Sequence, residues 1–544
     1  IVMEEKVFAK PFRLMGLGLS MLAVVGCSHT QTDSAVSESP SQVKNVIMMI
    51  GDGMGPQQMG LLENYAVNAS TSIYKEQPTG LTKMINHGTL GLSSHNPGDS
   101  IVADSACSAS QLATGVPSLS EAVGLDINGN SVETVLELAK AKGKATGLIS
   151  DTRLTHATPA AFAAHRYHRS LENQIAEDML ANQVDVMLSG GLRYWIPKEA
   201  NEKGEVYQSL VEKTGGTVKI KSKRKDNKNL LDDAEKMGYS LAFNRDDLSK
   251  VDNGKLLGLF AYSGMQDGIE YSQTKNDPKR TMPGLKEMTE KALDILSQDE
   301  DGFFLMIEGG RIDWAGHDND AGTMLHEMLK FDEAVNYVYE WASKRNDTLV
   351  LVTADHETGG FGFSYSRANL PAAKTVEGAA FEGVSYKPNF NFGSFDILDK
   401  LYMQKKSFAN ILADYDDSDK TPQALVSLVN ENSEFDITLD QAEAILAREN
   451  NEYQVKGHKY LNADTFPKVN DFKAFYVYGN EIRNDLLGRA LGEQQNVVWG
   501  TGTHTSTPVA VIAFGPDAVA SKFSSMTHHI ELGKLAKKAV AGEM

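Results

Sequence analysis

A series of short apolar runs, each ending abruptly at glycine or polar residues, limits how this chain can fold more than any other feature. The first run, Asn45 to Ile50, opens into Gly51-Asp52-Gly53-Met54-Gly55, as a fully buried strand does when it enters a loop. The same pattern recurs at Ala145 to Ser150, Asp185 to Leu188, Phe303 to Glu308, Leu349 to Asp355 and Val509 to Phe514. These runs predict strands that are buried on both faces.

Segments with helical patterns, such as 131–142 and 283–296, lie between these runs. Strands that alternate with helices predict an α/β fold, in which helices sandwich a central, mainly parallel sheet. Ligands of such sheets bind beyond the carboxyl ends of the strands. Because Asp52, Glu308 and Asp355 all stand at strand ends, we expect their carboxylates to converge on one edge of the sheet.

The amino end differs in composition from the rest of the chain. Lys6, Lys10 and Arg13 precede an apolar run from Leu14 to Gly26, which is too short for a permanent membrane span. We interpret residues 1–27 as a signal peptide, and we therefore expect an exported, periplasmic protein.

The predicted signal peptide ends in Val24-Val25-Gly26-Cys27, which resembles the lipobox of bacterial lipoproteins. Cys27 would then carry a lipid that anchors the protein to a membrane. The alternative is a cysteine that lies by chance beside an ordinary cleavage site. Residues 28–42 are rich in Ser, Thr and Gln, and this composition predicts a flexible tether.

Charge and cysteine content restrict the partners of the chain and its sources of stability. The formal net charge is −19, which argues against a nucleic-acid partner because such binding relies on clustered Lys and Arg. One basic run, Lys221 to Lys228, departs from this trend, and we interpret it as a solvated loop in preference to a binding patch. The only cysteine after Cys27 is Cys107, so a disulfide within the mature domain is impossible.

The stretch of about 361–489 lacks the alternation of strands and helices and includes the Asn- and Phe-rich segment Tyr386 to Phe395. Long irregular stretches inside compact domains usually have a function of their own. We interpret this stretch as an insertion within a catalytic domain of residues 43–544, not as an independent domain.

The densest cluster of reactive side chains is Glu308-Gly-Gly-Arg-Ile-Asp313-Trp314-Ala-Gly-His317, which begins at a strand end and continues into a predicted helix. Asp313 and His317 are four residues apart, so a helix places both on one face. There, a carboxylate oxygen and an imidazole nitrogen can bind the same zinc ion. The alternative is an ion pair on the helix surface.

Two further segments carry potential metal ligands. In Thr353-Ala-Asp-His-Glu-Thr-Gly359, Asp355 and His356 can share a metal only if the backbone leaves the strand, because successive strand side chains point to opposite faces. The alternative for this segment is a polar turn. His504 lies in Gly500-Thr-Gly-Thr-His-Thr, just before the last strand, where a histidine is more often an ordinary loop residue.

A candidate nucleophile, Ser105, lies in Val102-Ala-Asp-Ser-Ala-Cys-Ser-Ala109, where small residues predict a helix that begins near this serine. A helix amino terminus favours bound anions, although a serine there often serves only as a cap. No G-x-S-x-G motif surrounds Ser105 and no local histidine is paired with it. A metal would therefore have to lower the pKa of its hydroxyl.

The segment from His156 to Arg169 contains Thr158 and two more histidines, His165 and His168. The planar guanidinium of Arg169 can bind two phosphate oxygens at once, whereas a lone arginine after a helix is usually a surface charge. We treat His165 and His168 as structural residues.

Together, these segments resemble the motifs of alkaline phosphatases, in the family's chain order and over nearly the whole mature chain. The long insertion makes the chain most similar to the marine-bacterial type, in which such an insertion forms a crown-like loop over the second subunit of a homodimer. The resemblance implies two zinc ions, the first bound by Asp313, His317 and His504 and the second by Asp52, Asp355 and His356. It also implies a magnesium ion bound by Asp52, Thr158 and Glu308, with Ser105 as the nucleophile and Arg169 as the phosphate clamp.

Two site positions vary within the family, and here they are His156 and Trp314. Neither residue carries the charge that the enteric enzymes have at that position. This difference affects how tightly magnesium and phosphate bind, and it favours faster product release. We expect both side chains to contact the substrate, and packing in the core is the alternative for Trp314.

The predicted function is hydrolysis of phosphate monoesters by a metal-activated serine, through a phosphoserine intermediate. Uncatalysed hydrolysis requires accelerations of up to ~10²¹-fold, whereas one oxyanion-hole donor supplies roughly 10² to 10³, so hydrogen bonds alone do not suffice. Inorganic phosphate would be both product and inhibitor, and the role would be phosphate scavenging.

Three alternatives differ in what they require of the sequence. A sulfatase needs a C/S-x-P-x-R motif, which Cys107-Ser-Ala-Ser does not match. A phosphodiesterase should lack the match at Arg169. A non-catalytic metal- or phosphate-binding lipoprotein has no need of Ser105 beside a full set of ligands.

Overall fold

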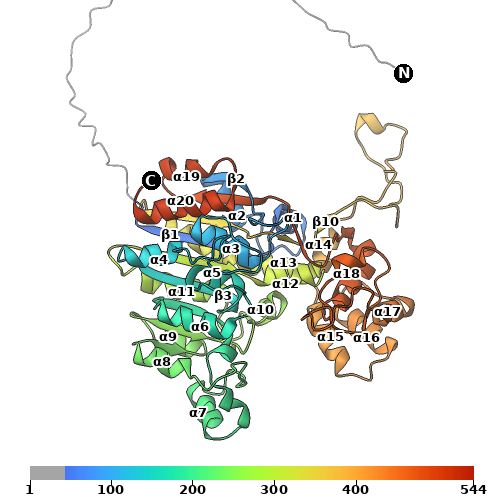
Figure 1. Cartoon of the computed structure of the whole chain (residues 1–544). Helices are drawn as coiled ribbons and strands as arrows, with labels where there is room; N and C mark the ends of the chain where they lie inside the picture. Colours follow the sequence, from blue (N-terminus) through green and yellow to red (C-terminus); the bar gives the residue numbers. More distant parts are fainter. Residues whose placement is uncertain (1–42) are drawn as a thin grey trace, which may run out of the picture. The chain divides into compact units, whose positions relative to one another are not determined.

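The structure is a computed structural model that describes residues 43–544 (Figure 1). The predicted signal peptide at 1–27, with its lipobox Cys27, and the predicted tether at 28–42 lie outside the described residues. Within residues 43–544, no helix is both long enough and apolar enough to cross a lipid bilayer.

One sheet of ten strands forms the centre, in the order β16-β2-β15-β8-β1-β7-β3-β4-β6-β5. The strands from β8 through β1 to β5 pair in parallel, and β15 joins β8 antiparallel. The predicted fold class is therefore confirmed. Every run predicted as a strand lies in this sheet: β1 (Asn45–Gly51), β3 (Ala145–Arg153), β4 (Val186–Gly190), β7 (Phe303–Gly309), β8 (Thr348–Thr353) and β15 (Val509–Phe514).

The sequence pattern missed the short strands at the two sides of the sheet. These are β2 (Thr89–Ser94), β5 (Ser240–Ala242), β6 (Leu256–Leu259) and β16 (Met526–His528). In β2, buried residues alternate with exposed ones, as in a strand with one solvated face. A strand like β2 therefore offers no continuous apolar run to detect, whereas β6 is a fully buried run of LLGL that the prediction did not include.

Alternate side chains of β1 enter two hydrophobic cores, because successive strand residues point to opposite faces of the sheet. Ile47 and Met49 lie in the first core, and Met48 and Ile50 lie in the second. Each fully buried side chain of this kind contributes roughly 1.5 to 3 kcal/mol by leaving water. Both faces of the sheet are thus covered.

Helices on the two faces supply the other halves of these cores (Figure 1). The first core includes side chains of α1 (Pro56–Asn68), α2 (Gly80–His87), α11 (Leu285–Leu296) and α13 (Ala321–Ala342). The second includes side chains of α3 (Ser105–Thr114), α4 (Val135–Ala141), α5 (Ala157–Ala163), α6 (Glu172–Ala181) and α20 (His529–Ala541). The predicted helices at 131–142 and 283–296 correspond to α4 and α11, which begin later because Thr134 and Gly284 are their N-caps.

Residues 361–489 contain several helices that pack on the first core. Ile411, Leu425 and Leu487 are fully buried and belong to that core. The last helix of the segment continues past residue 489 to Gln495. The elements are β10 (Gly362–Phe363), α14 (Asp396–Tyr402), α15 (Phe408–Asp416), α16 (Pro422–Asn432), α17 (Leu439–Leu446), β11 (Arg448–Asn450), β12 (Thr465–Pro467) and α18 (Ile482–Gln495).

The register of the central strands determines where the site lies. Ile50 of β1 pairs with Glu308 of β7 and with Thr353 of β8. Because these strands are parallel, their carboxyl ends meet at one edge.

The remaining α-helices and strands are α7 (Glu205–Lys213), α8 (Leu230–Lys236), α9 (Arg245–Ser249), α10 (Gly268–Thr274), α12 (Arg311–His317), β9 (Glu357–Thr358), β13 (Val497–Val498), β14 (His504–Thr505) and α19 (Asp517–Ala520).

Candidate active site

Three carboxylates converge at the carboxyl edge of the sheet, as their positions after apolar runs predicted. Asp52 follows β1, Glu308 lies near the end of β7, and Asp355 follows β8; all three are fully buried. The ligand atoms of Asp52 lie within 4.8 Å of those of Asp355 and His356, and also within 4.8 Å of those of His156 and Glu308. Asp52 therefore joins two groups that can each hold a cation.

Asp355 and His356 face the same space because the backbone leaves the strand before them. β8 ends at Thr353, and the Oδ2 of Asp355 lies 3.1 Å from the Nε2 of His356. The backbone N–H groups of Gly53 and His356 donate to the other carboxylate oxygen, Oδ1, at 3.1 and 2.9 Å. These bonds fix the carboxylate so that Oδ2 points toward the imidazole.

Ser105 is the first residue of α3, and its hydroxyl lies at the same site. The N-cap is Asp104, whose carboxylate accepts from the N–H groups of Ala106 and Cys107 at 3.1 and 3.3 Å. The alternative that Ser105 only caps the helix is therefore wrong. The Oγ of Ser105 lies 3.1 Å from the Nε2 of His356, and its side chain is buried.

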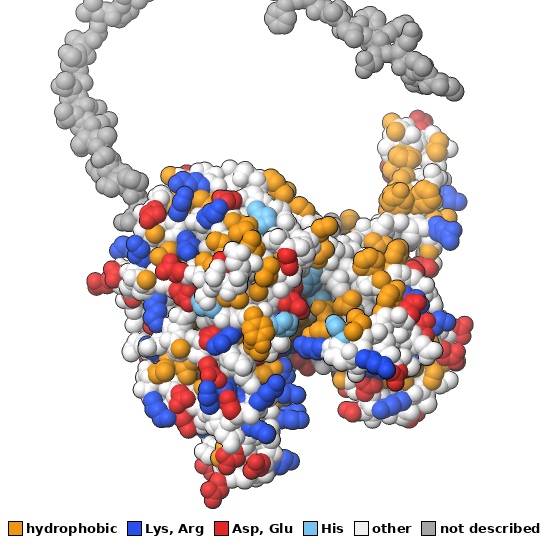
Figure 2. All heavy atoms as spheres, viewed as in Figure 1, with side chains coloured by type: hydrophobic (Ala, Val, Ile, Leu, Met, Phe, Trp, Pro, Cys, Tyr) orange, Lys and Arg blue, Asp and Glu red, His pale blue; other side chains and the backbone are white. Residues whose placement is uncertain are grey.

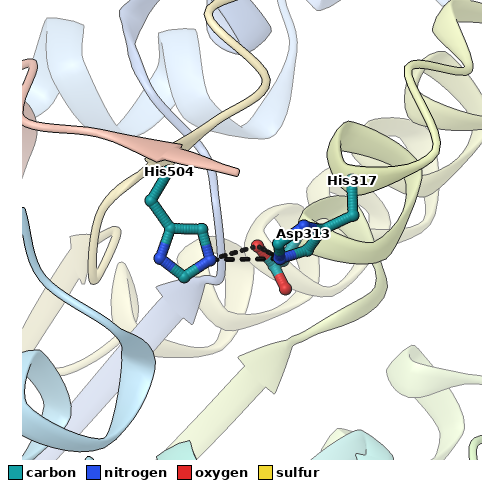
Figure 3. A group of neighbouring side chains, drawn as sticks. All are labelled: Asp313, His317 and His504. Atoms are coloured by element: carbon teal, nitrogen blue, oxygen red, sulfur yellow. Dashed lines mark hydrogen bonds and ion pairs between the residues drawn. The ribbon is translucent and has the colours of Figure 1, made fainter. Parts of the chain in front are cut away.

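A second cluster consists of Asp313, His317 and His504 (Figure 3). The two histidines approach the Oδ1 of Asp313 from α12 and β14, each with its Nε2 at 3.4 Å. Their other ring nitrogens face backbone carbonyls, of Gly502 for His317 and of Ala103 for His504, at 2.8 Å in both cases. Such outer contacts orient imidazoles toward a metal.

The region around Glu308 offers mostly oxygen ligands. Ser150 donates to its Oε2, while the hydroxyl of Thr158 lies 3.4 Å from the Oδ2 of Asp52. His156, the N-cap of α5, brings an imidazole into the group with Asp52 and Glu308. The sequence-predicted ligands of all three ions are thus found in the same region of the protein.

Arg169 points into the site and is not a free surface charge. Its Nη1 donates to Asp104 at 2.8 Å, and its Nη2 lies 3.3 Å from the Nε2 of His156. The ring of Trp314 lies 6.0 Å from that of His156, edge to face. Ser105, Arg169, His156 and Trp314 all line one cavity of about 750 Å³.

The two histidines treated as structural lie apart from the metal-ligand groups. His165 contacts the carbonyl of Gly124 at 2.8 Å and the carboxylate of Glu137 at 2.9 Å. His168 lies at the cavity wall, 3.3 Å from Glu121.

The electrostatics of the cluster favour bound cations. Burial and repulsion from Asp355, Asp313 and Glu308 raise the pKa of Asp52 well above its usual range. Burial also raises the pKa of Glu308. Nearby positive charge is what allows such groups to ionise.

Several buried ligand atoms lack a hydrogen bond among residues 43–544, although Asp355 Oδ2 and Asp52 Oδ1 lie 3.1 and 3.6 Å from the Nε2 of His356. Asp52 Oδ1, Asp355 Oδ2 and Glu308 Oε1 accept no hydrogen bond there. Burying a carboxylate oxygen without a hydrogen bond is costly, so these atoms are suited to bind a metal ion. Imidazole and carboxylate groups suit zinc, and oxygen groups suit magnesium.

Two useful residues were not singled out by the sequence analysis. Asp104 both caps α3 and binds Arg169; an aspartate just before a predicted helix is the signal for such a cap. Thr358 donates to the Oδ1 of Asp313 at 2.5 Å. Only the folded chain reveals that contact, because 45 residues separate the two positions.

The sequence model of the alkaline phosphatase family matches residues 43–541, nearly all of the described chain. The chain belongs to the alkaline phosphatase family. The predicted family is thereby confirmed, and the protein is a metal-dependent hydrolase of phosphate monoesters. Its carboxylate and histidine groups are candidates for holding the metals.

Individual alkaline phosphatases resemble this chain over most of its length. Alkaline phosphatase 3 of Bacillus subtilis is 29% identical over 541 residues, which cover 97% of this chain and 95% of the relative. The cold-active alkaline phosphatase of a psychrophilic Shewanella has a TM-score of 0.63 and 25% identity, covering 91% of this chain and 99% of that one. The alkaline phosphatase of Thermus thermophilus, at 22% identity, shares the fold with a TM-score of 0.70 over 96% of each chain.

Proposed function

We propose that Ser105 is the nucleophile of this phosphatase and that each turnover passes through a phosphoserine. One observation carries the proposal. The Nε2 of His356 lies 3.1 Å from the Oγ of Ser105, 3.1 Å from the Oδ2 of Asp355 and 3.6 Å from the Oδ1 of Asp52. The serine hydroxyl thus borders a group of ligand atoms suited to a cation, and nearby positive charge lowers the pKa of a hydroxyl.

We assign two zinc ions and one magnesium ion to the three groups of ligands. When bound, these ions would promote ionisation of the serine and balance charge on the attacking and leaving oxygens. The ligands would be Asp313, His317 and His504 for the first zinc, Asp52, Asp355 and His356 for the second, and Asp52, Thr158 and Glu308 for magnesium.

The residues of the chain itself bind the phosphate and carry the covalent step. Arg169 would bind two phosphate oxygens, with its guanidinium held by Asp104. The Oγ of Ser105 attacks phosphorus, the bond to the ester oxygen breaks, and that oxygen leaves as an alcohol. Water then attacks the phosphoserine, which releases inorganic phosphate and restores the serine. His156 and Trp314 would contact the bound ester at the cavity wall.

The biological setting follows from the amino-terminal residues and from the family resemblance. We propose that the protein is exported to the periplasm, with a lipid anchor at Cys27, and that it scavenges phosphate from monoesters. Inorganic phosphate would inhibit it as a product. We also propose a homodimer, with the insertion at about 361–489 reaching over the partner subunit.

Trapping of the intermediate tests the serine mechanism. The metal-loaded protein is incubated with labelled inorganic phosphate, quenched in acid and digested. We expect the label on the peptide that contains Ser105, and we expect Ser105→Ala to retain no label and to lose nearly all hydrolysis of p-nitrophenyl phosphate. Label on another residue, or hydrolysis that survives Ser105→Ala, would contradict the proposal. A non-catalytic binding protein would give no covalent label.

A comparison of three substrates separates the proposed activity from those of related hydrolases. We expect p-nitrophenyl phosphate to be cleaved much faster than bis-p-nitrophenyl phosphate or p-nitrophenyl sulfate. Faster cleavage of the diester or the sulfate would identify a phosphodiesterase or a sulfatase instead. Metal analysis by mass spectrometry on the same samples gives the zinc and magnesium content.

A further inference from the structure

We propose that Lys225 and Lys459 form a second anion-binding subsite at the mouth of the catalytic cavity. This subsite would favour phosphate monoesters whose leaving group carries a second phosphate. The inference rests on the proposed function, because it concerns the leaving group of the ester that Ser105 attacks. Both lysines line the same cavity as Ser105 and Arg169.

The two lysines belong to loops that are far apart in the sequence. Lys225 lies in the basic run at 221–228, and Lys459 lies in the loop between β11 and β12. Figure 2 shows Lys and Arg side chains gathered along one edge of the region that carries α7. The basic run, interpreted from the sequence as a solvated loop, thus contributes one residue to the catalytic cavity.

The backbone around Lys225 is fixed by the buried side chain of Arg224. This guanidinium donates to Glu177 at 2.6 Å, to both carboxylate oxygens of Asp226 at 2.7 and 2.9 Å, and to the carbonyls of Asn173 and Tyr194 at 3.1 Å. The side chain of Arg224 has no exposed surface, whereas Lys225 is exposed. Lys225 therefore extends toward solvent from an ordered loop.

The loop that carries Lys459 is held by its own side chains. The Nδ1 of His458 accepts from the N–H groups of Tyr460 and Leu461, both at 3.1 Å. The ammonium of Lys459 lies 4.7 Å from the centre of the Tyr460 ring, and that ring contacts Tyr478 at 5.1 Å. Both tyrosines line the cavity, so Lys459 lies at the rim of an aromatic wall.

Among the positively charged side chains that line the cavity, these two lysines are the ones available to bind an anion. Outside the metal-ligand groups, the arginines are paired, Arg169 with Asp104 at 2.8 Å and Arg153 with Glu172 at 2.9 Å. Among residues 43–544, neither lysine has an ion-pair partner or a side-chain hydrogen bond. Two further acids line this cavity: Glu121 lies 3.3 Å from His168, and Glu481 lies 3.8 Å from His317. In a chain of net charge −19, two free ammonium groups here attract an anion locally.

The depth of the residues indicates which part of a substrate meets the lysines. Ser105 is buried, so the reacting phosphate lies at the base of the cavity. The lysines are exposed, and the leaving group extends from the base toward them. A second phosphate is a dianion near neutral pH and can contact both ammonium groups, whereas an uncharged leaving group gains nothing from them.

The test compares alkanediol bisphosphates with alkyl monophosphates of the same chain length. For one chain length, we expect the metal-loaded enzyme to show a kcat/KM per phosphate group that is roughly 3- to 10-fold higher for the bisphosphate than for the monophosphate. The ratio of these two values is modest because exposed ion pairs contribute modestly. Lys225→Gln/Lys459→Gln should reduce this ratio to about 1 and leave p-nitrophenyl phosphate hydrolysis unchanged. Added salt should reduce the ratio in the wild type.

Matched lysines of the same loops serve as controls. Lys223→Gln/Lys456→Gln removes the same charge from residues that do not line the cavity, and it should keep the preference. A second readout is calorimetric binding of the bisphosphate to metal-loaded Ser105→Ala, whose affinity should fall when the two cavity lysines are replaced. A wild type that cleaves p-nitrophenyl phosphate but shows no preference, or a preference that survives the double variant, would overturn the inference. A wild type that cleaves no ester would overturn the proposed function beneath it.

Discussion

The Oγ of Ser105 lies 3.1 Å from the Nε2 of His356, although 251 residues separate the two positions. A hydrogen bond between serine and histidine is also part of the Ser-His-Asp triad, in which a carboxylate orients the ring nitrogen that faces away from the serine. In this protein, that nitrogen, Nδ1, lies 3.3 Å from the hydroxyl of Thr358, and the carboxylates of Asp52 and Asp355 lie on the Nε2 side. The geometry favours His356 as a metal ligand over a general base.

Replacement of His356 distinguishes these two roles. We expect His356→Gln to lose about one zinc per chain by mass spectrometry, together with at least about 100-fold in kcat, because even outer-shell contacts of a metal site are worth 10- to 100-fold. His165→Gln, a histidine outside the metal-ligand groups, should keep full metal content. An inactive His356→Gln that retained all of its zinc would support the general-base role instead.

Metal removal should destabilise the protein, and more so at higher pH. In the metal-free state, burial and neighbouring carboxylates raise the pKa values of Asp52 and Glu308. A carboxyl whose folded pKa exceeds its unfolded pKa contributes stability at low pH, and that contribution is lost as pH rises through the folded value. The metal-free protein should therefore lose stability as pH rises above the ordinary carboxyl range.

Thermal unfolding from pH 5 to pH 8 measures this effect. Metal at about 1,000 times its Kd adds about 4 kcal/mol of stability, so the loaded protein should have the higher Tm throughout, and the difference should grow with pH. Metal-free Glu308→Gln should show a weaker pH dependence than metal-free wild type. If Tm changed equally with pH in these two metal-free proteins, Glu308 would not be a source of the pH dependence.

The phosphate clamp should depend on the shape of the arginine as well as on its charge. Arg169→Lys keeps the positive charge but loses the planar fork that Asp104 holds at 2.8 Å. Hydrogen bonds to charged groups contribute about 1.5 to 3 kcal/mol, so we expect roughly 10- to 100-fold lower kcat/KM and weaker inhibition by phosphate. Arg166→Lys, at a bidentate pair with Asp178 away from the cavity, should leave both constants within about twofold.

The central strands and much of the site could be predicted because their signals are local. Each buried strand is a continuous apolar run, so its end, and with it the position of Asp52, Glu308 and Asp355, can be read from the sequence. The spacing of Asp313 and His317 has meaning only on a helix, and α12 provides one. His504 could be predicted only weakly, since it is the folded chain that brings β14 to Asp313.

Contacts between distant segments could not be derived in this way. The approach of Ser105 to His356 depends on how α3 and the end of β8 pack against the sheet, and no local pattern encodes it. The same is true of the cavity wall, which combines Lys225 with the loop of Lys459. Family resemblance supplied the grouping of ligands that spacing alone could not.

The group with Asp52 and Glu308 contains an imidazole where a third carboxylate would suit magnesium better. His156 lies in this group, and burial, Arg153 and Arg169 lower the pKa of its imidazole, which favours the neutral form. Magnesium prefers oxygen ligands, whereas imidazole suits zinc. We therefore expect His156→Asp to bind magnesium more tightly, by about tenfold or more in a titration of the metal-free protein. Unchanged magnesium affinity would show that residue 156 does not contact this ion.

A buried ion network behind the site should connect stability to catalysis. Lys330 is 4% exposed, and its ammonium lies 2.9 Å from the Oδ2 of Asp151 and also contacts Glu327. The Oδ1 of Asp151 accepts from the N–H of Gly310 at 2.7 Å, and Gly310 is the N-cap of α12. The network therefore fixes the start of the helix that carries Asp313 and His317.

Lys330→Met would leave the buried carboxylate of Asp151 without its cation, and Glu327 with only Arg311, whose Nε lies 3.5 Å away. Removing one partner of a buried ion pair costs about 3 to 5 kcal/mol, so urea denaturation should show a loss of this size in the free energy of unfolding. As a control, Lys344→Met, at an exposed position, should change that free energy by less than about 0.5 kcal/mol. If the network positions α12, Lys330→Met should also weaken zinc retention in the folded protein, measured at a urea concentration far below the transition. The double variant Lys330→Met/Asp151→Asn should regain part of the stability, because the unpaired charge of Asp151 is gone. It should not regain zinc retention, because an amide does not restore the fixed geometry at Gly310. Full zinc retention in both variants would limit the role of Lys330 to folding.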